Sequence, residues 1–424
     1  MYVAVNFITF VAYFAAFCSW GYVVCGSRRN EGWMPAVGIA CCTIVATLGL
    51  ECGLPVSVSG RLIFTIAAGG GLLWLFRKPR RWRSPPPATV VICVLVALVL
   101  IAPMAIGGPQ FALFQLNIND QFNYLATAAM RTTETHRSIE TATRADFIKN
   151  SLMPIAHTMS GARPAIVDLY ATLEGLLPGN LHRCHYGFLC AFMMGSFFAV
   201  AEFLSFLCGA VSWRAHLIAA AYVTGFWGQL QFDLNAWSWT AATPLAAASI
   251  GMLASMPPWS GTMSEDERPD WRSGVTLGIC TAGQIYIYPE MFVFLAPAAI
   301  LVLGLATFFR PNPPHVAANY TFAAIAALAL TVPKLAAILK FTFHQVLFSS
   351  KANFSPLDWM WQMIVGGSLT GTGAFESALR WMTPLDQVGK SPTDGRRERS
   401  SSWNGAASGF LSPIRRGILR HLDP

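Results

Sequence analysis

The chain has 424 residues, of which 54% are hydrophobic and only 12% are charged, and its mean hydropathy is +0.47. A soluble globule of this size needs more charged surface, so the composition excludes that class and indicates an integral membrane protein. The net charge of +8 does not indicate nucleic-acid binding. Outside one long loop the basic residues lie in short loops and in the tail, and no nucleic-acid module is recognisable.

Apolar runs close to the 20 residues that cross a hydrocarbon core recur along the chain. They predict an all-α integral membrane protein with about ten transmembrane helices. The first run lacks an early cationic region and a convincing small-residue cleavage site, so we predict a retained span and not a signal peptide. In chain order the runs are Tyr2–Cys25, Met34–Cys52, Leu62–Phe76, Thr89–Ala105, Tyr186–Val211, Ala215–Phe232, Trp237–Met256, Val275–Tyr288, Met291–Phe309 and Val316–Leu339.

The basic residues of the short loops predict the orientation. The densest cluster between spans is RKPRRWR, Arg77–Arg83, which the positive-inside rule places on the cytoplasmic side. Alternating from this loop puts GSRRNEG, Arg214, SEDERPDWR and Arg310 on the same side. The N-terminus and the long loop between the fourth and fifth spans then lie on the extracytoplasmic face.

These expectations divide the chain into five regions. Residues 1–106 hold the first four spans, residues 107–185 form a long extracytoplasmic loop with interfacial helices, and residues 186–339 hold the remaining spans. Residues 340–386 are expected to be a membrane-associated or partial helical segment. Residues 387–424 turn basic and rich in Ser and Gly, which indicates a disordered tail, with an altered reading frame as the alternative.

Common motifs of soluble enzymes are absent from the sequence. There is no phosphate-binding GxxxxGK[ST], no GxSxG and no HExxH. The ten cysteines neither follow zinc-ligand spacing nor form a framework of pairs, and most fall within spans, where packing is the expected role. The histidines show no spacing that identifies a metal site.

The stretch QLNINDQFNYLATAAMR, Gln115–Arg131, opens the long loop with amides around one acid. If Asn117–Arg131 is helical, one face carries that acid together with polar residues three and four positions apart. Because the acid follows an apolar run, it should lie near the outer interface, where a carboxylate suits proton abstraction. A helix-capping role is the alternative. The residues of this face are Asp120, Asn123, Tyr124, Thr127 and Arg131.

Further polar residues fall at outer span ends, in the stretches QLQFDLNAWSW, QIYIYPEMF and LTVPKLAAIL. Charge at a membrane interface usually faces a protein cavity, so we predict a substrate site on this side. An ion pair between Glu290 and Lys334 that only fixes packing is the alternative. The predicted substrate-binding residues are Asn123, Tyr124, Asp233, Tyr288 and Glu290.

The basic residues near the outer face suit a phosphate headgroup, because a guanidinium binds phosphate oxygens bidentately. Arg131 stands out because it shares the face of Asp120. Contact with water or anionic lipid is the alternative for each basic residue. The candidate phosphate-binding residues are Arg131, Arg137, Arg163 and Lys334.

With its many spans, an early outer loop that opens with the acid of INDQFNYLA, and polar residues at outer span ends, the region Thr89–Leu339 resembles the GT-C class of integral membrane glycosyltransferases. The resemblance implies a polyprenyl-phosphate sugar as donor and a glycan, lipid or protein as acceptor. It implies that Asp120 is the catalytic base of an inverting transfer. No cofactor is implied with certainty, and a divalent metal stays open. The short inner loops and the lack of organelle signals fit a bacterial inner membrane, with a eukaryotic endomembrane as the alternative.

Three other classes remain open. A polysaccharide polymerase that uses an undecaprenyl-pyrophosphate glycan would share the large outer loop rich in Arg. A transporter or flippase of a lipid-linked or anionic solute would continue its polar residues to the inner face, whereas Met291–Phe309 is almost entirely apolar. A structural membrane subunit would tolerate loss of Asp120, Glu290 and Lys334.

Overall fold

The computed structural model describes residues 2–26, 31–76, 86–113, 118–160, 164–208, 213–225, 237–255, 271–289, 297, 300, 301, 304 and 314–340. Over these ranges the regular secondary structure is helical, with no strand, which confirms the all-α class. Several predictions fall outside the described residues. They concern Arg163, Asp233, Glu290, the cluster Arg77–Arg83 and the regions that follow residue 340.

Two compact units divide the chain. The first consists of Met1–Arg144 and Leu152–Asn353, and the second of Ala145–Ser151 and Phe354–Pro424. The short helix α7 (Arg144–Lys149) falls mostly in the second unit. The helices described below all belong to the first unit.

Five helical stretches among the described residues are long and apolar enough to cross a membrane, which makes this a multi-pass membrane protein. Their outward side chains include Ile325 and Leu328, which are apolar and largely exposed, as on a surface that faces lipid. The same holds for Leu98 in a sixth, shorter apolar helix, Pro87–Pro103. The five stretches are α1 (Tyr2–Cys25), α2 (Met34–Glu51), α3 (Val56–Phe76), α10 (Leu181–Leu207) and Ala318–Lys340, which runs through α16 (Pro314–Thr331) and η4 (Val332–Lys334).

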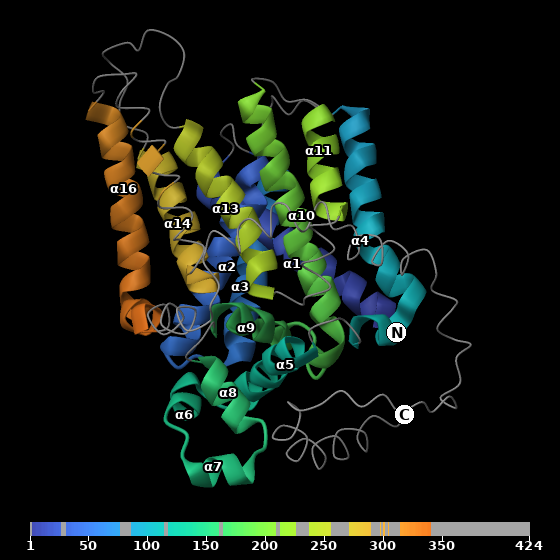
Figure 1. Ribbon diagram of the computed structural model, residues 1–424, viewed down its shortest axis with the longest axis vertical. Coiled ribbons are helices and arrows are strands. Elements are labelled where there is room, and N and C mark those ends of the chain that lie inside the picture. The colour runs from blue at the N-terminus through green and yellow to red at the C-terminus, as the bar shows by residue number, and fades with distance from the viewer. Residues whose placement is uncertain are drawn as a thin grey trace, which may run out of the picture. The chain divides into compact units, whose positions relative to one another are not determined.

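Four more helices coincide with runs that the sequence predicts to span the membrane. They are α4 (Pro87–Leu113), α11 (Trp213–Thr224), α13 (Trp237–Ser255) and α14 (Trp271–Ile287). The packed pairs include α1 with α2, α1 with α10, α10 with α13, and α14 with α16 (Figure 1).

Glycines let the backbones of neighbouring spans approach closely. A Cβ added to Gly38 of α2 would lie 1.7 Å from the carbonyl oxygen of Phe17 in α1. A Cβ added to Gly21 of α1 would lie 1.9 Å from the carbonyl oxygen of Met34. Around these contacts the aromatic rings of Tyr13, Phe17 and Phe188 pack in the core. The α1–α2 pair therefore has no room for larger side chains at either glycine.

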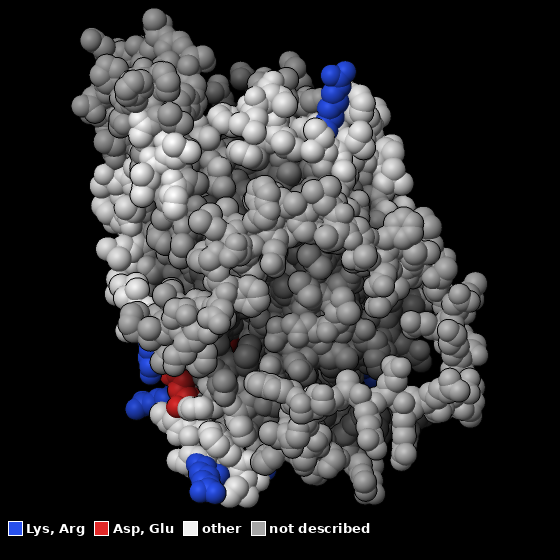
Figure 2. Space-filling model, viewed as in Figure 1, with Lys and Arg blue, Asp and Glu red and all other residues white. Residues whose placement is uncertain are grey.

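The segment between α4 and α10 is helical, and its helices in the first unit gather at one end of the bundle (Figure 1). It contains α5 (Ile118–Thr133), α6 (His136–Glu140), α8 (Met153–Ser160), α9 (Pro164–Ala171) and η2 (Thr172–Gly175). The face drawn in Figure 2 agrees with a membrane protein, because its described charged side chains lie toward two ends with uncharged described residues between them.

Helix α9 differs from the expected interfacial helices because it is buried. Every residue from Ala165 to Leu173 is fully inaccessible to solvent. The helix packs against α5 of the loop and against α2, α13 and α14 of the bundle. The physical reason is its sequence, AIVDLYATL, which offers almost only apolar side chains to its neighbours. The loop therefore extends into the core.

Candidate functional site

Helix α5 presents the polar face that the sequence predicts. Tyr124, Thr127 and Arg131 are buried along one side of the helix, and Asn123 is half-buried. Spacings of three and four residues bring these positions onto one face. Asp120 lies in the first turn of the same helix, and its side chain is outside the described part of the structure.

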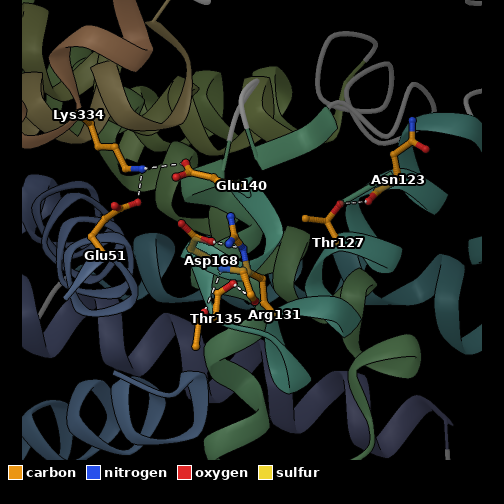
Figure 3. A network of polar contacts seen from close by, with 9 residues as sticks. Glu51, Asn123, Thr127, Arg131, Thr135, Glu140, Asp168 and Lys334 are labelled. Atoms are coloured by element: carbon orange, nitrogen blue, oxygen red, sulfur yellow. Dashed lines mark hydrogen bonds and ion pairs between the residues drawn. The ribbon is translucent and has the colours of Figure 1, made fainter. Parts of the chain in front are cut away.

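Arg131 forms a fully buried ion pair with Asp168 of α9. The Arg131 Nε and the Asp168 Oδ1 are 3.1 Å apart, and both side chains have 0% exposure (Figure 3). Asp168 is not among the residues that the sequence patterns single out. Its signal was an acid alone in an otherwise apolar stretch, because such an acid needs a cationic partner when its helix is buried.

The terminal nitrogens of Arg131 are buried as well. Neither Nη1 nor Nη2 has a hydrogen-bond partner within the described part of the chain. Burying an unsatisfied donor costs about 1–3 kcal/mol, and more for a charged group. Arg131 therefore offers donors for an anion at the junction between the loop and the bundle.

An aromatic layer adjoins this ion pair through α5 and α9. Trp237, the first residue of α13, is fully buried, and its ring stacks on Tyr124 with centroids 5.0 Å apart and planes 11° apart. Tyr170 of α9 meets the same indole edge-on at 5.0 Å. In this conformation Tyr124 and Trp237 cover one another, and both side chains are buried.

Tyr170 also ties α9 to the start of α10. Its hydroxyl donates a hydrogen bond to the carbonyl of Leu181. Burial raises the pKa of Tyr170 well above its ordinary value, because an interior of low dielectric constant disfavours the phenolate. The hydroxyl therefore stays protonated and keeps its role as a donor.

Lys334 is the second charged centre, and acids from two other elements surround it. It pairs with Glu51, the last residue of α2, and its Nζ lies 3.7 Å from a carboxylate oxygen of Glu140 in α6 (Figure 3). Its side chain is 8% exposed. The sequence placed Lys334 toward the outer end of the last predicted span and identified neither partner, and the expected alternative partner, Glu290, lies outside the described residues.

Two other predicted residues stand apart from these contacts. Arg137 of α6 is exposed, and its carbonyl accepts a hydrogen bond from the Thr141 hydroxyl. Tyr288 is half-buried against the core, and its N–H donates to the carbonyl of Gln284. Their predicted roles in binding phosphate and substrate stay predictions.

Buried polar atoms without hydrogen bonds also occur in two helices of the bundle that contact α9. The hydroxyls of Thr43 and Thr47 in α2 have no partner among the described residues, nor does either amide atom of Gln284 in α14. By contrast, the hydroxyls of Thr9 and Thr276 each donate to the carbonyl four residues earlier. Such groups are exceptions in folded proteins and indicate places for water or a polar ligand.

The cysteines form no disulfides, and the described acids, histidines and cysteines form no metal cluster. All ten cysteines are free thiols. No group of three or more His, Cys, Asp or Glu in the described ranges is arranged to hold a metal ion.

Comparison of the chain with models of known protein families, with curated proteins and with solved structures found no match.

Proposed function

We propose that the protein is an integral membrane glycosyltransferase of the GT-C type, which moves a sugar from a polyprenyl-phosphate donor to an acceptor on the extracytoplasmic face. The observation that carries the proposal is the buried guanidinium of Arg131, whose terminal nitrogens have no partner in the described part of the chain. It lies on the same helix as Asp120. A guanidinium of this kind suits the phosphate of the donor.

The spacing along α5 is compatible with these two roles. A rise of 1.5 Å per residue separates Asp120 and Arg131 by about 16 Å along the helix axis. Arg side chains lean toward the N-terminus of their helix, which shortens the gap. A sugar ring and an acceptor hydroxyl fit between a carboxylate at one end and a phosphate at the other.

In the proposed reaction Asp120 removes the proton of the acceptor hydroxyl, and the oxygen attacks the anomeric carbon while the bond from that carbon to the phosphate oxygen breaks. The configuration is inverted. Arg131 stabilises the negative charge that develops on the departing polyprenyl phosphate, and it accelerates the reaction only to the extent that this contact strengthens in the transition state.

The proposal includes a membrane topology and an opening motion. About ten helices cross a bacterial inner membrane, with α4, α11, α13 and α14 among them, and the helical loop faces outward. Because Arg131, Tyr124 and Trp237 are buried, the donor reaches them when α5 moves away from α13 while Arg131 keeps its contact with α9. The other residues predicted to bind the donor or the acceptor reach their ligands only in this open state.

A transfer assay tests the proposal. Membranes with equal amounts of inserted wild type, Asp120→Asn or the control Asp146→Asn are supplied with radiolabelled polyprenyl-phosphate sugars. General-base catalysis contributes about 10²–10⁴-fold, so Asp120→Asn should lose at least about 100-fold in rate, and Asp146→Asn should retain it. Full activity of Asp120→Asn would remove Asp120 as the base. Absence of product with every donor would contradict the proposed enzymatic function.

One observation favours a transporter or flippase of a lipid-linked or anionic solute as the second candidate. Thr43 lies eight residues before the outer end of α2, which is about 12 Å into the bundle, and its hydroxyl has no partner among the described residues. A polar path would use such groups. Counterflow of a labelled lipid-linked sugar in proteoliposomes, lost in Gln284→Leu, would support transport. A polymerase would instead yield lipid-linked chains of increasing length.

A further inference from the structure

The ion pair between Arg131 and Asp168 uses one part of the guanidinium and leaves another part buried without a hydrogen bond to any described residue. The closest contact joins the side nitrogen Nε to Asp168 Oδ1 at 3.1 Å. The end of the guanidinium, formed by Nη1 and Nη2, has no hydrogen-bond partner in the described residues. Two parallel N–H donors at such an end match two oxygens of a phosphate.

The charges at this place are balanced without a ligand. Both side chains are fully buried, and a buried cation without a partner would be strongly unfavourable. Asp168 supplies the compensating negative charge from α9, while Arg131 extends from α5. When a phosphate arrives at the Nη end, Arg131 faces two negative groups, the phosphate and Asp168, so Asp168 lowers the affinity for the phosphate.

We propose that Asp168 is the resident counter-ion of a phosphate site at the Nη end of Arg131: it stabilises the empty site and competes electrostatically with the arriving phosphate. The inference deepens the proposed function and rests on the role of Arg131 given there. It identifies Asp168 as a positioning residue that acts through Arg131 and sets how tightly the site holds and releases its phosphate group.

The test measures thermal unfolding of the full-length chain in neutral detergent with and without a phosphate probe. The variants are Asp168→Asn, Arg131→Lys and the double variant Arg131→Met with Asp168→Leu. The probes are inorganic phosphate, undecaprenyl phosphate and, as a neutral control, undecaprenol. Titration of each probe gives the shift of the midpoint and the apparent dissociation constant, because a ligand that binds only the folded state stabilises it.

Asp168→Asn should unfold at a lower temperature than wild type without a probe, because Arg131 loses its counter-ion. It should bind the phosphate probe at least about tenfold more tightly than wild type, because the competing charge is gone. The double variant should unfold near the wild-type temperature and show no shift with any probe, since neither charge remains. A destabilised Asp168→Asn with no phosphate-dependent recovery would mean a purely structural pair and would overturn the inference.

Arg131→Lys keeps the inference testable if Asp168→Asn does not fold. Lysine retains the charge for Asp168 but has no paired Nη end, so it should bind the phosphate probe about tenfold more weakly than wild type. Binding equal to wild type would overturn the assignment of the Nη end. Restored thermal stability with inorganic phosphate means that the site recognises the phosphate group alone. Restored stability only with undecaprenyl phosphate means that the polyprenyl chain of the lipid contributes too. Equal recovery with undecaprenol would overturn the site.

The outcomes separate this inference from the glycosyltransferase itself. Transfer that depends on Asp120, without phosphate recovery of Asp168→Asn, would overturn only the counter-ion role. If phosphate restores the thermal stability of Asp168→Asn but no donor supports transfer, the phosphate site is supported and the glycosyltransferase function is contradicted.

Discussion

Tyr124 of the helical loop and Trp237 of α13 lie ring against ring, with planes 11° apart and centroids 5.0 Å apart. The Tyr124 hydroxyl also lies 3.3 Å from the hydroxyl of Ser238. Because the two rings come from the loop and from the bundle, their contact holds α5 against the end of the spans. Opening the site separates a large, fully buried aromatic surface.

Replacing Trp237 should therefore destabilise the protein severely. Trp237→Ala removes a fully buried indole and should lower the free energy of unfolding by about 3–5 kcal/mol. Tyr124→Phe keeps the ring contact and should cost only about 1 kcal/mol for the lost hydroxyl interaction. Unfolding in detergent measures both values. Trp213→Ala is the matched control, because Trp213 is 48% exposed, and a loss as large as that of Trp237→Ala would contradict the packing argument.

The contacts of Lys334 should differ in strength. Lys334→Met leaves Glu51 without its cationic partner and should cost about 1–3 kcal/mol, a range reduced because the Glu51 side chain is 28% exposed. Glu140→Gln should cost less than about 1 kcal/mol, because that contact spans 3.7 Å and Glu140 is 45% exposed. Unfolding at low and high salt checks both. Equal losses in the two variants would contradict this ranking.

Replacement by alanine should have very different effects on the stability of the protein at two glycines in the spans. Gly38→Ala places a Cβ against the backbone of Phe17 and should cost about 3 kcal/mol or more, since backbone atoms must shift. Gly69→Ala in α3 meets nothing within 4 Å and should stay within about 1 kcal/mol of wild type. Thermal unfolding and the yield of inserted protein measure the difference. A neutral Gly38→Ala would mean that α1 and α2 pack less closely.

Tyr170 should make stability depend on alkaline pH. Its pKa in the folded protein is well above the ordinary value of 10.0, so above pH 10 the folded state binds more protons than the unfolded state. Its contribution is complete below pH 10 and is lost as the pH rises toward the folded pKa, with a slope of at most about 1.4 kcal/mol per pH unit. Unfolding of wild type and Tyr170→Phe between pH 7 and 11 checks this. Identical slopes would contradict it.

Local periodicity was enough to predict which residues of α5 share a face. Residue spacing alone places Tyr124, Thr127 and Arg131 on one side of the helix, and the structure buries all three, whereas their roles in a site stay predictions. The all-α class followed from the long apolar runs. In both cases the controlling interactions lie within one helix or between a helix and its surroundings.

The charge partners were not predictable in this way. Asp168 meets Arg131, and Glu51 and Glu140 meet Lys334, only because helices distant in sequence come together. The burial of α9 has the same origin. Its apolar stretch fits an interfacial helix and a core helix equally well, and only packing against α2, α13 and α14 distinguishes them.

The contact between α1 and α10 has a consequence for how the chain enters a membrane. Asn6 of α1 donates through Nδ2 to the carbonyl of Arg183 and accepts through Oδ1 from the N–H of Gly187. These groups are four residues apart, the spacing that closes one α-helical turn. In hydrocarbon there is no water to replace such a partner. Helix α10 therefore reaches its final hydrogen bonding only after docking on α1, which couples a segment from the middle of the chain to one synthesised at its beginning.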